Sequence, residues 1–353
     1  MRLWPRKWRQ VKPGRATKSN VVAAYNTILG RPPESEVVID AKLSHANIWD
    51  LIRTLTNSAE FKQRLKSQSS DYYHLAWRRL APPLAIDCGI QTDEAYARLE
   101  NRIRQTWERL GTEEPYFSVI TDQRFLMRER APDRQAFYDL GKGDAELVLS
   151  MLARAQVDSR KLRTCVEYGC GVGRATWQLA SLFDKVIAVD LSTSHIDIAR
   201  KWISDSGIRN VEFIKINNVT NIYKEDYDFW FSRIVLQHNP PPIIVRILME
   251  AFRHLRPGGI ALFQVPTYIK GYTFNLEEYL GTFGGEGQME MHCIPQRTLI
   301  NTIIAADCEI IEIIEDQDVG STQTMISNTF LVRKDRPTDH PQSSNRSADQ
   351  SIL

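Results

Sequence analysis

Short apolar segments alternate with helical stretches from residue 162 onward, and this alternation constrains the fold most strongly. Apolar runs of this length, separated by amphipathic stretches, are typical of parallel strands joined by helical crossovers. Five such strands are predicted, at residues 162–168, 185–190, 211–216, 227–232 and 259–265. The last two runs, 308–316 and 328–334, are separated only by a loop, so they are predicted to pair antiparallel. The pattern predicts an α/β fold: a doubly wound, mostly parallel sheet with a final antiparallel strand.

The chain before this Rossmann-like sheet has the pattern of an all-helical N-terminal region. Apolar residues recur at helical spacing around Val22, Tyr25 and Ile28, and Gly30 followed by two prolines ends the first run. We expect this region to dock against the sheet or to cover its substrate side. The predicted organisation is a basic tail (1–18), a small helical module (19–66), a helical connecting or cap region (67–140), the α/β domain (141–335) and a disordered tail (336–353).

Three glycines in five positions, Gly169, Gly171 and Gly173, follow the first predicted strand. In a doubly wound sheet this position binds ligands. The dinucleotide pattern GxGxxG requires a third glycine where Arg174 stands, and no Gly-Lys-Ser/Thr follows to make a P-loop. Glu167, two residues before the first glycine, would repel phosphates and suits a cationic ligand without phosphate. S-adenosylmethionine, which carries an ammonium and a sulfonium, meets this requirement.

The segment "VEYGCGVGRAT" resembles the first motif of class I S-adenosylmethionine-dependent methyltransferases, and the resemblance extends over about residues 140–333. Asp190 ends the second strand, where the family's acid accepts hydrogen bonds from both ribose hydroxyls. Asn217 or Asn218 stands where many relatives have an aspartate that contacts the adenine. Pro257, Gly258 and Gly259 resemble the family's turn into the fifth strand.

The resemblance implies S-adenosyl-L-methionine as the cofactor and ten candidate residues for binding it. The candidates are Glu167, Gly169, Cys170, Gly171, Gly173, Asp190, Leu191, Asn217, Asn218 and Ser232. Taken singly, the glycines could be turn residues and Asp190 a helix cap, but their arrangement at the ends of successive strands favours a binding site.

Candidate acceptor residues follow the fourth strand and a later insertion. Gln237 and His238 lie where the family's acceptor meets the methyl group, and His238 or His292 could serve as a general base. Either histidine could instead have a structural role. The insertion at 267–292 is expected to cover the active site, with Tyr268 and Tyr272 contacting the substrate or only packing within the insertion.

The composition is ordinary, with 42% hydrophobic and 25% charged residues and a net charge of +2, which does not favour a nucleic-acid partner. Five cysteines without CxxC spacing indicate reduced thiols and no metal site. No apolar run approaches the roughly 18 residues of a membrane span. Seven Lys or Arg and no acid within the first 18 residues predict a solvated tail, or an arm that contacts anionic membrane. A cytoplasmic protein is expected, and the membrane-contacting arm, as the alternative to a solvated tail, would place it at the inner membrane surface.

The segment "AYNTILGRPPESEVV" and the later "SAEF" resemble a small helical module attached to bacterial surface-saccharide glycosyltransferases and methyltransferases. Together the two resemblances predict a bacterial enzyme of polysaccharide biosynthesis that O-methylates a sugar of a glycan or lipid-linked glycan precursor. The alternatives are a small-molecule methyltransferase and a non-catalytic Rossmann-type scaffold that recruits glycosyltransferases. An oxidoreductase is disfavoured because Arg174 stands where the dinucleotide-binding motif requires its third glycine.

Overall fold

The computed structural model of this chain contains two compact units, residues 1–82 and 83–353, which are described separately. The structure describes residues 16–45, 47–63, 84–89, 92–127, 133–219, 225–282, 288–316, 318–319 and 324–335. The predicted disordered tail and all but the last three residues of the predicted basic tail lie outside these ranges. Among the described helices, none is both long enough and apolar enough to cross a bilayer.

The first unit is a small helical module. Its described helices are α1 (Lys18–Ala24), the π-helical turn η2 (Tyr25–Leu29), α2 (Glu36–Lys42) and α3 (Ile48–Thr56). Thr17 and Asn20 form a capping box that starts α1, and Gly30 ends η2 in a left-handed conformation (φ 69°). Val21, Leu51 and Leu55 are the centre of its core. The prediction of a helical N-terminal region is thus confirmed.

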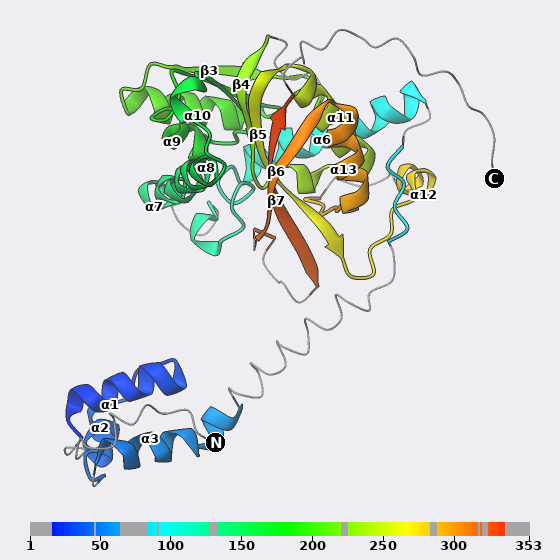
Figure 1. The fold of residues 1–353 in the computed structure, drawn as a ribbon. Helices are drawn as coiled ribbons and strands as arrows, with labels where there is room; N and C mark the ends of the chain where they lie inside the picture. The colour runs from blue at the N-terminus through cyan, green and yellow to red at the C-terminus, as the bar shows by residue number, and fades with distance from the viewer. Residues whose placement is uncertain are drawn as a thin grey trace. The chain divides into compact units, whose positions relative to one another are not determined.

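A seven-stranded sheet forms the centre of the second unit, in the order β3-β2-β1-β4-β5-β7-β6 (Figure 1). The strands are β1 (Thr164–Tyr168), β2 (Lys185–Asp190), β3 (Val211–Lys215), β4 (Tyr227–Ser232), β5 (Leu255–Ile269), β6 (Cys308–Asp316) and β7 (Met325–Lys334). Strands β1 to β5 pair in parallel, and β7 is antiparallel to both β5 and β6. The predicted fold class is confirmed.

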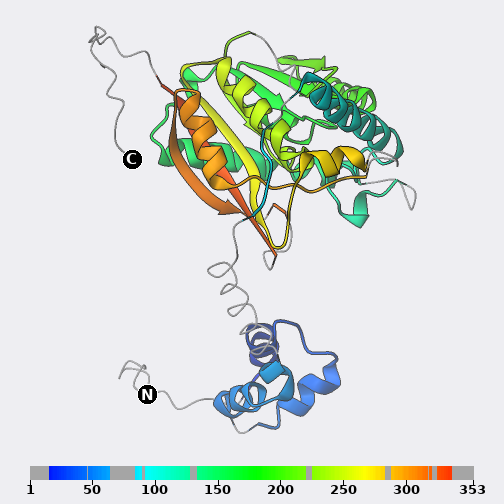
Figure 2. The same ribbon diagram turned by 90° about the vertical axis from the view of Figure 1, so that its right-hand side faces the viewer.

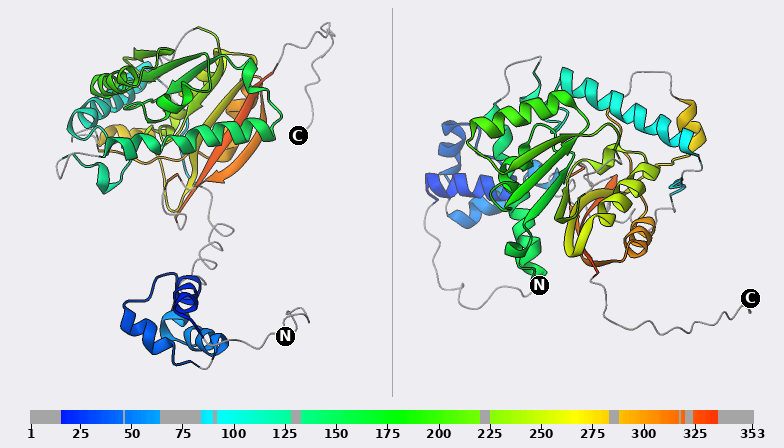
Figure 3. Two further views of the ribbon diagram at one scale, coloured as in Figure 1. Left: turned by 90° about the vertical axis from the view of Figure 1, so that its left-hand side faces the viewer. Right: turned by 90° about the horizontal axis from the view of Figure 1, so that it is seen from above.

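Helices cover both faces of this sheet. They are α6 (Asp93–Glu113), α7 (Arg134–Asp139), α8 (Lys142–Arg154), α9 (Arg174–Leu179), α10 (Thr193–Asp205), α11 (Pro241–Arg253), α12 (Leu276–Gly281) and α13 (Gln296–Ala305). Short 3-10 turns occur at η3 (Gln123–Phe125), η4 (Ser159–Lys161) and η5 (Leu236–His238). One apolar cluster joins α8 and α9 to the sheet, and the other joins α6, α11 and α13 to its opposite face (Figures 2 and 3).

Helix α6 belongs to the same unit as the sheet and lies over its ligand-binding side. Its N-terminal half contacts α12, and its C-terminal half contacts α10 (Figure 3, right). Helix α6, which falls within the predicted connecting or cap region (67–140), thus packs against the elements around the sheet. Buried Tyr96, Leu99 and Ile103 repeat at helical spacing along α6 and form its contact with the sheet core.

Two local features differ from the sequence expectations. Pro257, Gly258 and Gly259 lie within β5, where the register with β4 shifts between Tyr227 and Phe229, so the predicted turn is a bulge in the strand. The predicted insertion begins inside β5, which continues to Ile269 paired with β7. Residues 283–287 of the insertion lie outside the described residues.

Candidate active site

The glycine loop leaves β1 and turns directly into α9. Gly169 has a φ of 75° and Gly171 a φ of 53°, a left-handed conformation that other residues rarely adopt. A Cβ atom on Gly169 would lie 2.5 Å from Val235, and one on Gly171 would lie 2.7 Å from Val119. The loop therefore needs glycine both for its backbone conformation and for its close approach to two neighbouring segments.

A cavity lies beside this loop at the carboxyl ends of β1, β2 and β4. This is the position at which doubly wound sheets bind ligands. Seven of the predicted site residues line it: Glu167, Gly169, Cys170, Gly171, Asp190, Leu191 and His238. The cavity thus brings together most of the predicted cofactor residues and one of the two predicted bases.

The other predicted cofactor residues lie around this cavity without forming its wall. Ile216 and Val219, on either side of Asn217 and Asn218, form the wall there. Ser232 is buried, and its hydroxyl donates to the Tyr168 carbonyl (3.1 Å), which ties β4 to β1. Gly173 is the N-terminal cap residue of α9, and a Cβ there would lie 3.0 Å from Ala199.

Asp190 is held in place by backbone groups from two segments. One carboxylate oxygen accepts from the Gly171 N–H (2.8 Å) and the other from the Ser192 N–H (2.9 Å). Burial alone would raise the pKa of Asp190, but the adjacent His195 ring and these two N–H groups lower it below its ordinary value. The carboxylate is therefore ionised and firmly oriented at the cavity wall.

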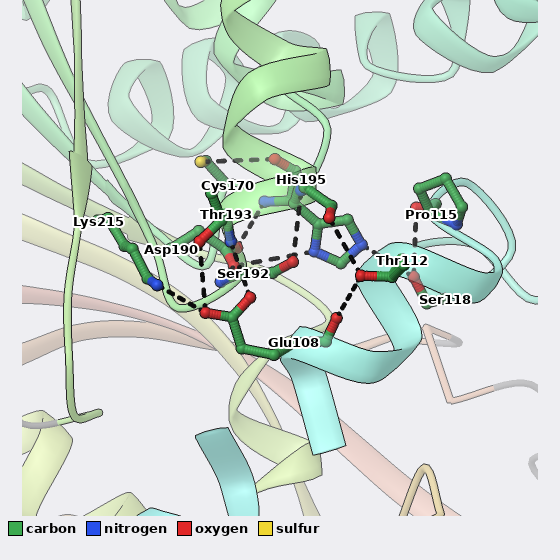
Figure 4. Close-up of polar contacts among 12 residues, drawn as sticks. Glu108, Thr112, Pro115, Ser118, Cys170, Asp190, Ser192, Thr193, His195 and Lys215 are labelled. Carbon is green, nitrogen blue, oxygen red and sulfur yellow. Dashed lines mark hydrogen bonds and ion pairs between the residues drawn. The ribbon is translucent and has the colours of Figure 1, made fainter. Parts of the chain in front are cut away.

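Helix α6 and the segment after it are attached to this corner of the cavity (Figure 4). The Glu108 carboxylate accepts from the Thr193 N–H (3.1 Å) and from Lys215 Nζ (2.6 Å). The Ser118 hydroxyl lies 3.0 Å from His195 Nε2. These contacts hold the covering segment against the strand ends that carry Asp190.

A buried charge network forms the cavity wall on the α8 and α9 side. Asp144, which is fully buried, accepts from both Arg174 and Arg233, and Arg233 also donates to Asp318 (2.6 Å). Arg174 and Arg233 line the cavity, and the buried Nε of Arg174 has no hydrogen-bond partner within the part of the chain that the structure describes. Arg174, which stands where the dinucleotide motif requires a glycine, thus lines the cavity and is held there by its ion pair with Asp144.

Glu167 lies next to this network. Its carboxyl group accepts from the Thr176 hydroxyl (2.5 Å), and burial raises its pKa to about 8. An acid with this pKa is largely protonated at pH 7, and a cation bound beside it would favour its ionised form. Because its pKa lies near 8, Glu167 should be mostly neutral in the empty cavity and ionised when a cationic ligand is bound.

His238 lies on η5 at the cavity wall, and its neighbours define its tautomer. Nδ1 lies 2.8 Å from the Glu290 carbonyl oxygen, which can only accept, so Nδ1 carries the hydrogen and Nε2 presents a lone pair. Burial lowers the pKa of His238 to about 4, so the ring is neutral at pH 7.

A chain of amides supports this ring from the other side. The Ile234 N–H donates to Gln264 (3.0 Å), Gln264 donates to Gln237 (3.1 Å), and the Gln237 amide nitrogen lies 3.5 Å from His238 Nε2. Gln237 is therefore a buried support for His238 and does not line the cavity.

The predicted residues of the insertion lie away from the cavity. His292 uses both ring nitrogens, one with the Tyr272 hydroxyl (2.7 Å) and one with the Glu290 carboxylate (3.0 Å). Tyr272 is thus occupied with His292, and Tyr268 pairs with Ile326 in the sheet. The geometry favours His238 over His292 as a base, since only His238 borders the cavity.

Several wall residues had no signal in the sequence. Trp107 and Ile103 come from α6, and Ser118 and Val119 follow it. Helical spacing indicates that the α6 residues are buried, but it does not indicate that residues at least 50 positions before the glycine loop face the cavity beside that loop.

Residues 165–259 match a family described as "Methyltransferase domain". A part of this chain therefore matches a methyltransferase domain. The predicted cofactor, S-adenosylmethionine, is confirmed with it. The glycine loop, Asp190, Leu191 and His238 all lie within the matched residues.

Individual relatives show more distant similarity. The malonyl-[acyl-carrier protein] O-methyltransferase of Bacillus cereus is 30% identical over 183 residues, which cover 51% of this chain and 58% of that enzyme. The trans-aconitate 2-methyltransferase of Deinococcus radiodurans is 29% identical over 113 residues, covering 32% and 42%. The chain therefore spans about half the length of these relatives. The magnesium protoporphyrin IX methyltransferase of Synechocystis, solved with bound S-adenosylhomocysteine, has a TM-score of 0.48 at 16% identity over 69% of this chain and 100% of that one.

Proposed function

We propose that this protein is an S-adenosylmethionine-dependent O-methyltransferase. The observation that carries the proposal is one cavity bordered by the glycine loop, an ionised Asp190 and the neutral imidazole of His238. When bound, S-adenosylmethionine supplies a methyl group activated by its sulfonium. The protein's part is then to hold donor and acceptor in line and to take up the acceptor's proton.

The wall residues fit this cofactor. Asp190 would accept hydrogen bonds from the ribose hydroxyls, and Leu191, Ile216 and Val219 offer an apolar surface for the adenine. Glu167 would pair with the ammonium group. Gly169 and Gly171 let the loop backbone pack closely against Val235 and Val119, so no loop side chain comes between these segments.

His238 Nε2 would receive the proton of the acceptor hydroxyl, which would replace the long contact from the Gln237 amide nitrogen (3.5 Å). A pKa of about 4 makes this imidazole a weak base, yet it is unprotonated at pH 7. An alcohol oxygen becomes strongly acidic as its bond to the methyl carbon forms, because a protonated ether is a strong acid. A weak, neutral and well-oriented base is therefore sufficient late in the reaction.

We propose a sugar of a bacterial glycan or of a lipid-linked glycan precursor as the acceptor. The support is the resemblance of residues 19–66 to modules attached to enzymes of surface saccharides. Seven basic residues and two tryptophans within residues 1–18 are suited to contact with an anionic membrane surface, where lipid-linked precursors reside. A small-molecule acceptor is the alternative, favoured by the name of the trans-aconitate relative.

Two measurements test the proposal. Calorimetry of the full chain with S-adenosylhomocysteine should detect binding, and absence of binding at millimolar ligand would refute a methyltransferase and favour a scaffold. Labelled S-adenosylmethionine is then incubated with glycan, lipid, protein and small-molecule fractions. Label only in protein or small molecules would refute the sugar acceptor. His238→Ala should lose activity, whereas His292→Ala should retain more of it.

A further inference from the structure

The turn that leaves β4 has a backbone conformation that its residue type disfavours. Ile234 has a φ of 61°, and a β-branched residue is rare in this left-handed region because its Cβ crowds the backbone. The other described non-glycine residues with positive φ, Gln156 and Asp307, each come directly after a helix C-cap, where a left-handed residue commonly ends the helix. Ile234 follows a strand, so its conformation needs another source of support.

The side-chain amide of Gln264 on β5 supplies that support. Its oxygen accepts from the Ile234 N–H (3.0 Å), and its nitrogen donates to the Gln237 amide oxygen (3.1 Å) and to the Ser327 hydroxyl of β7 (2.6 Å). Gln264 is fully buried and uses both ends of its amide, so the orientation of the amide is fixed. The turn after β4 is thus fastened to two strands of the sheet through one side chain.

The conformation of Ile234 determines where several parts of the cavity wall lie. Arg233, Ile234 and Val235 all line the cavity. Val235 packs against the glycine loop, since a Cβ on Gly169 would lie 2.5 Å from its side chain. The Val235 carbonyl also accepts from the His238 N–H (3.1 Å) at the start of η5. A rotation of the backbone at Ile234 would therefore move Val235 and His238 together.

We infer that Gln264 is a positioning residue of this site. It holds Ile234 in the left-handed conformation, and it thereby keeps Val235 against the glycine loop and His238 at the cavity wall. Gln264 itself does not line the cavity, so it acts through the turn. The consequence for cofactor binding and methyl transfer rests on the proposed function, whereas the hold on Ile234 does not depend on it.

The test is a double-mutant cycle on the full chain with Gln264→Met and Ile234→Gly. Methionine preserves the length of the side chain and removes its hydrogen bonds, and glycine adopts positive φ as readily as negative φ. Gln264→Met should lower the melting temperature of the second unit, because the strained turn loses its support. It should also weaken S-adenosylhomocysteine binding roughly tenfold in calorimetry, because most molecules then leave the binding conformation.

In the Ile234→Gly background both losses should shrink. Gln264→Met should there weaken binding by less than about threefold and lower the melting temperature by less than about half as much, because glycine needs no support at this φ. Initial rates at saturating S-adenosylmethionine, with the acceptor fraction that takes the label, should follow the same pattern. A glutamine with only a structural role would give no such recovery.

Gln296→Met is the matched control. The Gln296 amide also donates to a β7 residue, Asn328 (3.0 Å), but it belongs to α13 and does not line the cavity, so the affinity for S-adenosylhomocysteine should not change. Unchanged affinity in Gln264→Met, or equal losses in the two backgrounds in affinity or in melting temperature, would overturn the inference. Absence of S-adenosylhomocysteine binding by the unaltered chain would instead refute the proposed function, and the melting temperatures would still decide whether Gln264 holds Ile234.

Discussion

Removing the Asp144 carboxylate should destabilise the second unit strongly. Asp144 is fully buried and accepts from Arg174, whose side chain is 8% exposed, and from Arg233. In Asp144→Ala, Arg233 keeps Asp318, but Arg174 becomes a buried cation without its carboxylate. Breaking one side of a buried ion pair costs about 3–5 kcal/mol. At about 2 °C per kcal/mol for a unit of this size, the melting temperature should fall by roughly 6–10 °C.

At high pH, ionisation of Glu167 should reduce the loss of stability caused by Asp144→Ala. Both burial and Asp144 raise the pKa of Glu167, while Arg174 lowers it, so loss of Asp144 should favour ionisation of Glu167. In the unaltered protein the folded state holds this proton up to a pH of about 8, whereas the unfolded chain releases it near 4.5. Stability therefore falls as the pH rises between these values, and the fall should be smaller in Asp144→Ala.

Scanning calorimetry of the full chain between pH 5 and 8.5 measures both effects on the transition of the second unit. Asp139→Ala is the control, because Asp139 pairs with Lys142 at the surface and its loss should change stability by about 0.5 kcal/mol or less. The double variant Asp144→Ala/Arg174→Met removes both charges and should recover most of the lost stability. A melting temperature within 2 °C of the unaltered protein for Asp144→Ala, or no recovery in the double variant, would refute this reasoning.

Three further predictions concern the cavity. Asp190→Asn should weaken S-adenosylhomocysteine binding by one to two decades in calorimetry, since a charged hydrogen bond contributes about 1.5–3 kcal/mol, and unchanged affinity would place the ribose elsewhere. Asp190→Ala should in addition lower the melting temperature, because the N–H groups of Gly171 and Ser192 lose their acceptor. Binding should strengthen as the pH rises toward 8 and Glu167 ionises beside the ligand's ammonium, and a Glu167→Gln variant with the same pH dependence would contradict this. Initial rates at saturating S-adenosylmethionine should show no loss between pH 8 and 5.5, because His238 gains its proton only near pH 4, and a fall near pH 6.5 under saturation would exclude it as the base.

Local patterns predicted the sheet well, because parallel strands that are buried on both faces appear in the sequence as short, nearly continuous apolar runs. β1, β2 and β4 are short and buried, with helical stretches between them, and both their order along the chain and their parallel pairing follow from that alternation. The glycine loop was predictable for a related reason. A backbone with positive φ beside Val235 and Val119 accepts only glycine, so the constraint appears as residue identity.

The sequence by itself determined the fold class, the glycine loop and the position of the acid at the end of β2, because each depends on residues close together in the chain. Only the tertiary structure decided which residues close the site. It brought Trp107 of α6 beside His238, occupied both nitrogens of His292, and paired Arg174 with Asp144 across two helices. Contacts between distant segments depend on how helices pack over the sheet, and neither helical spacing nor residue type specifies them.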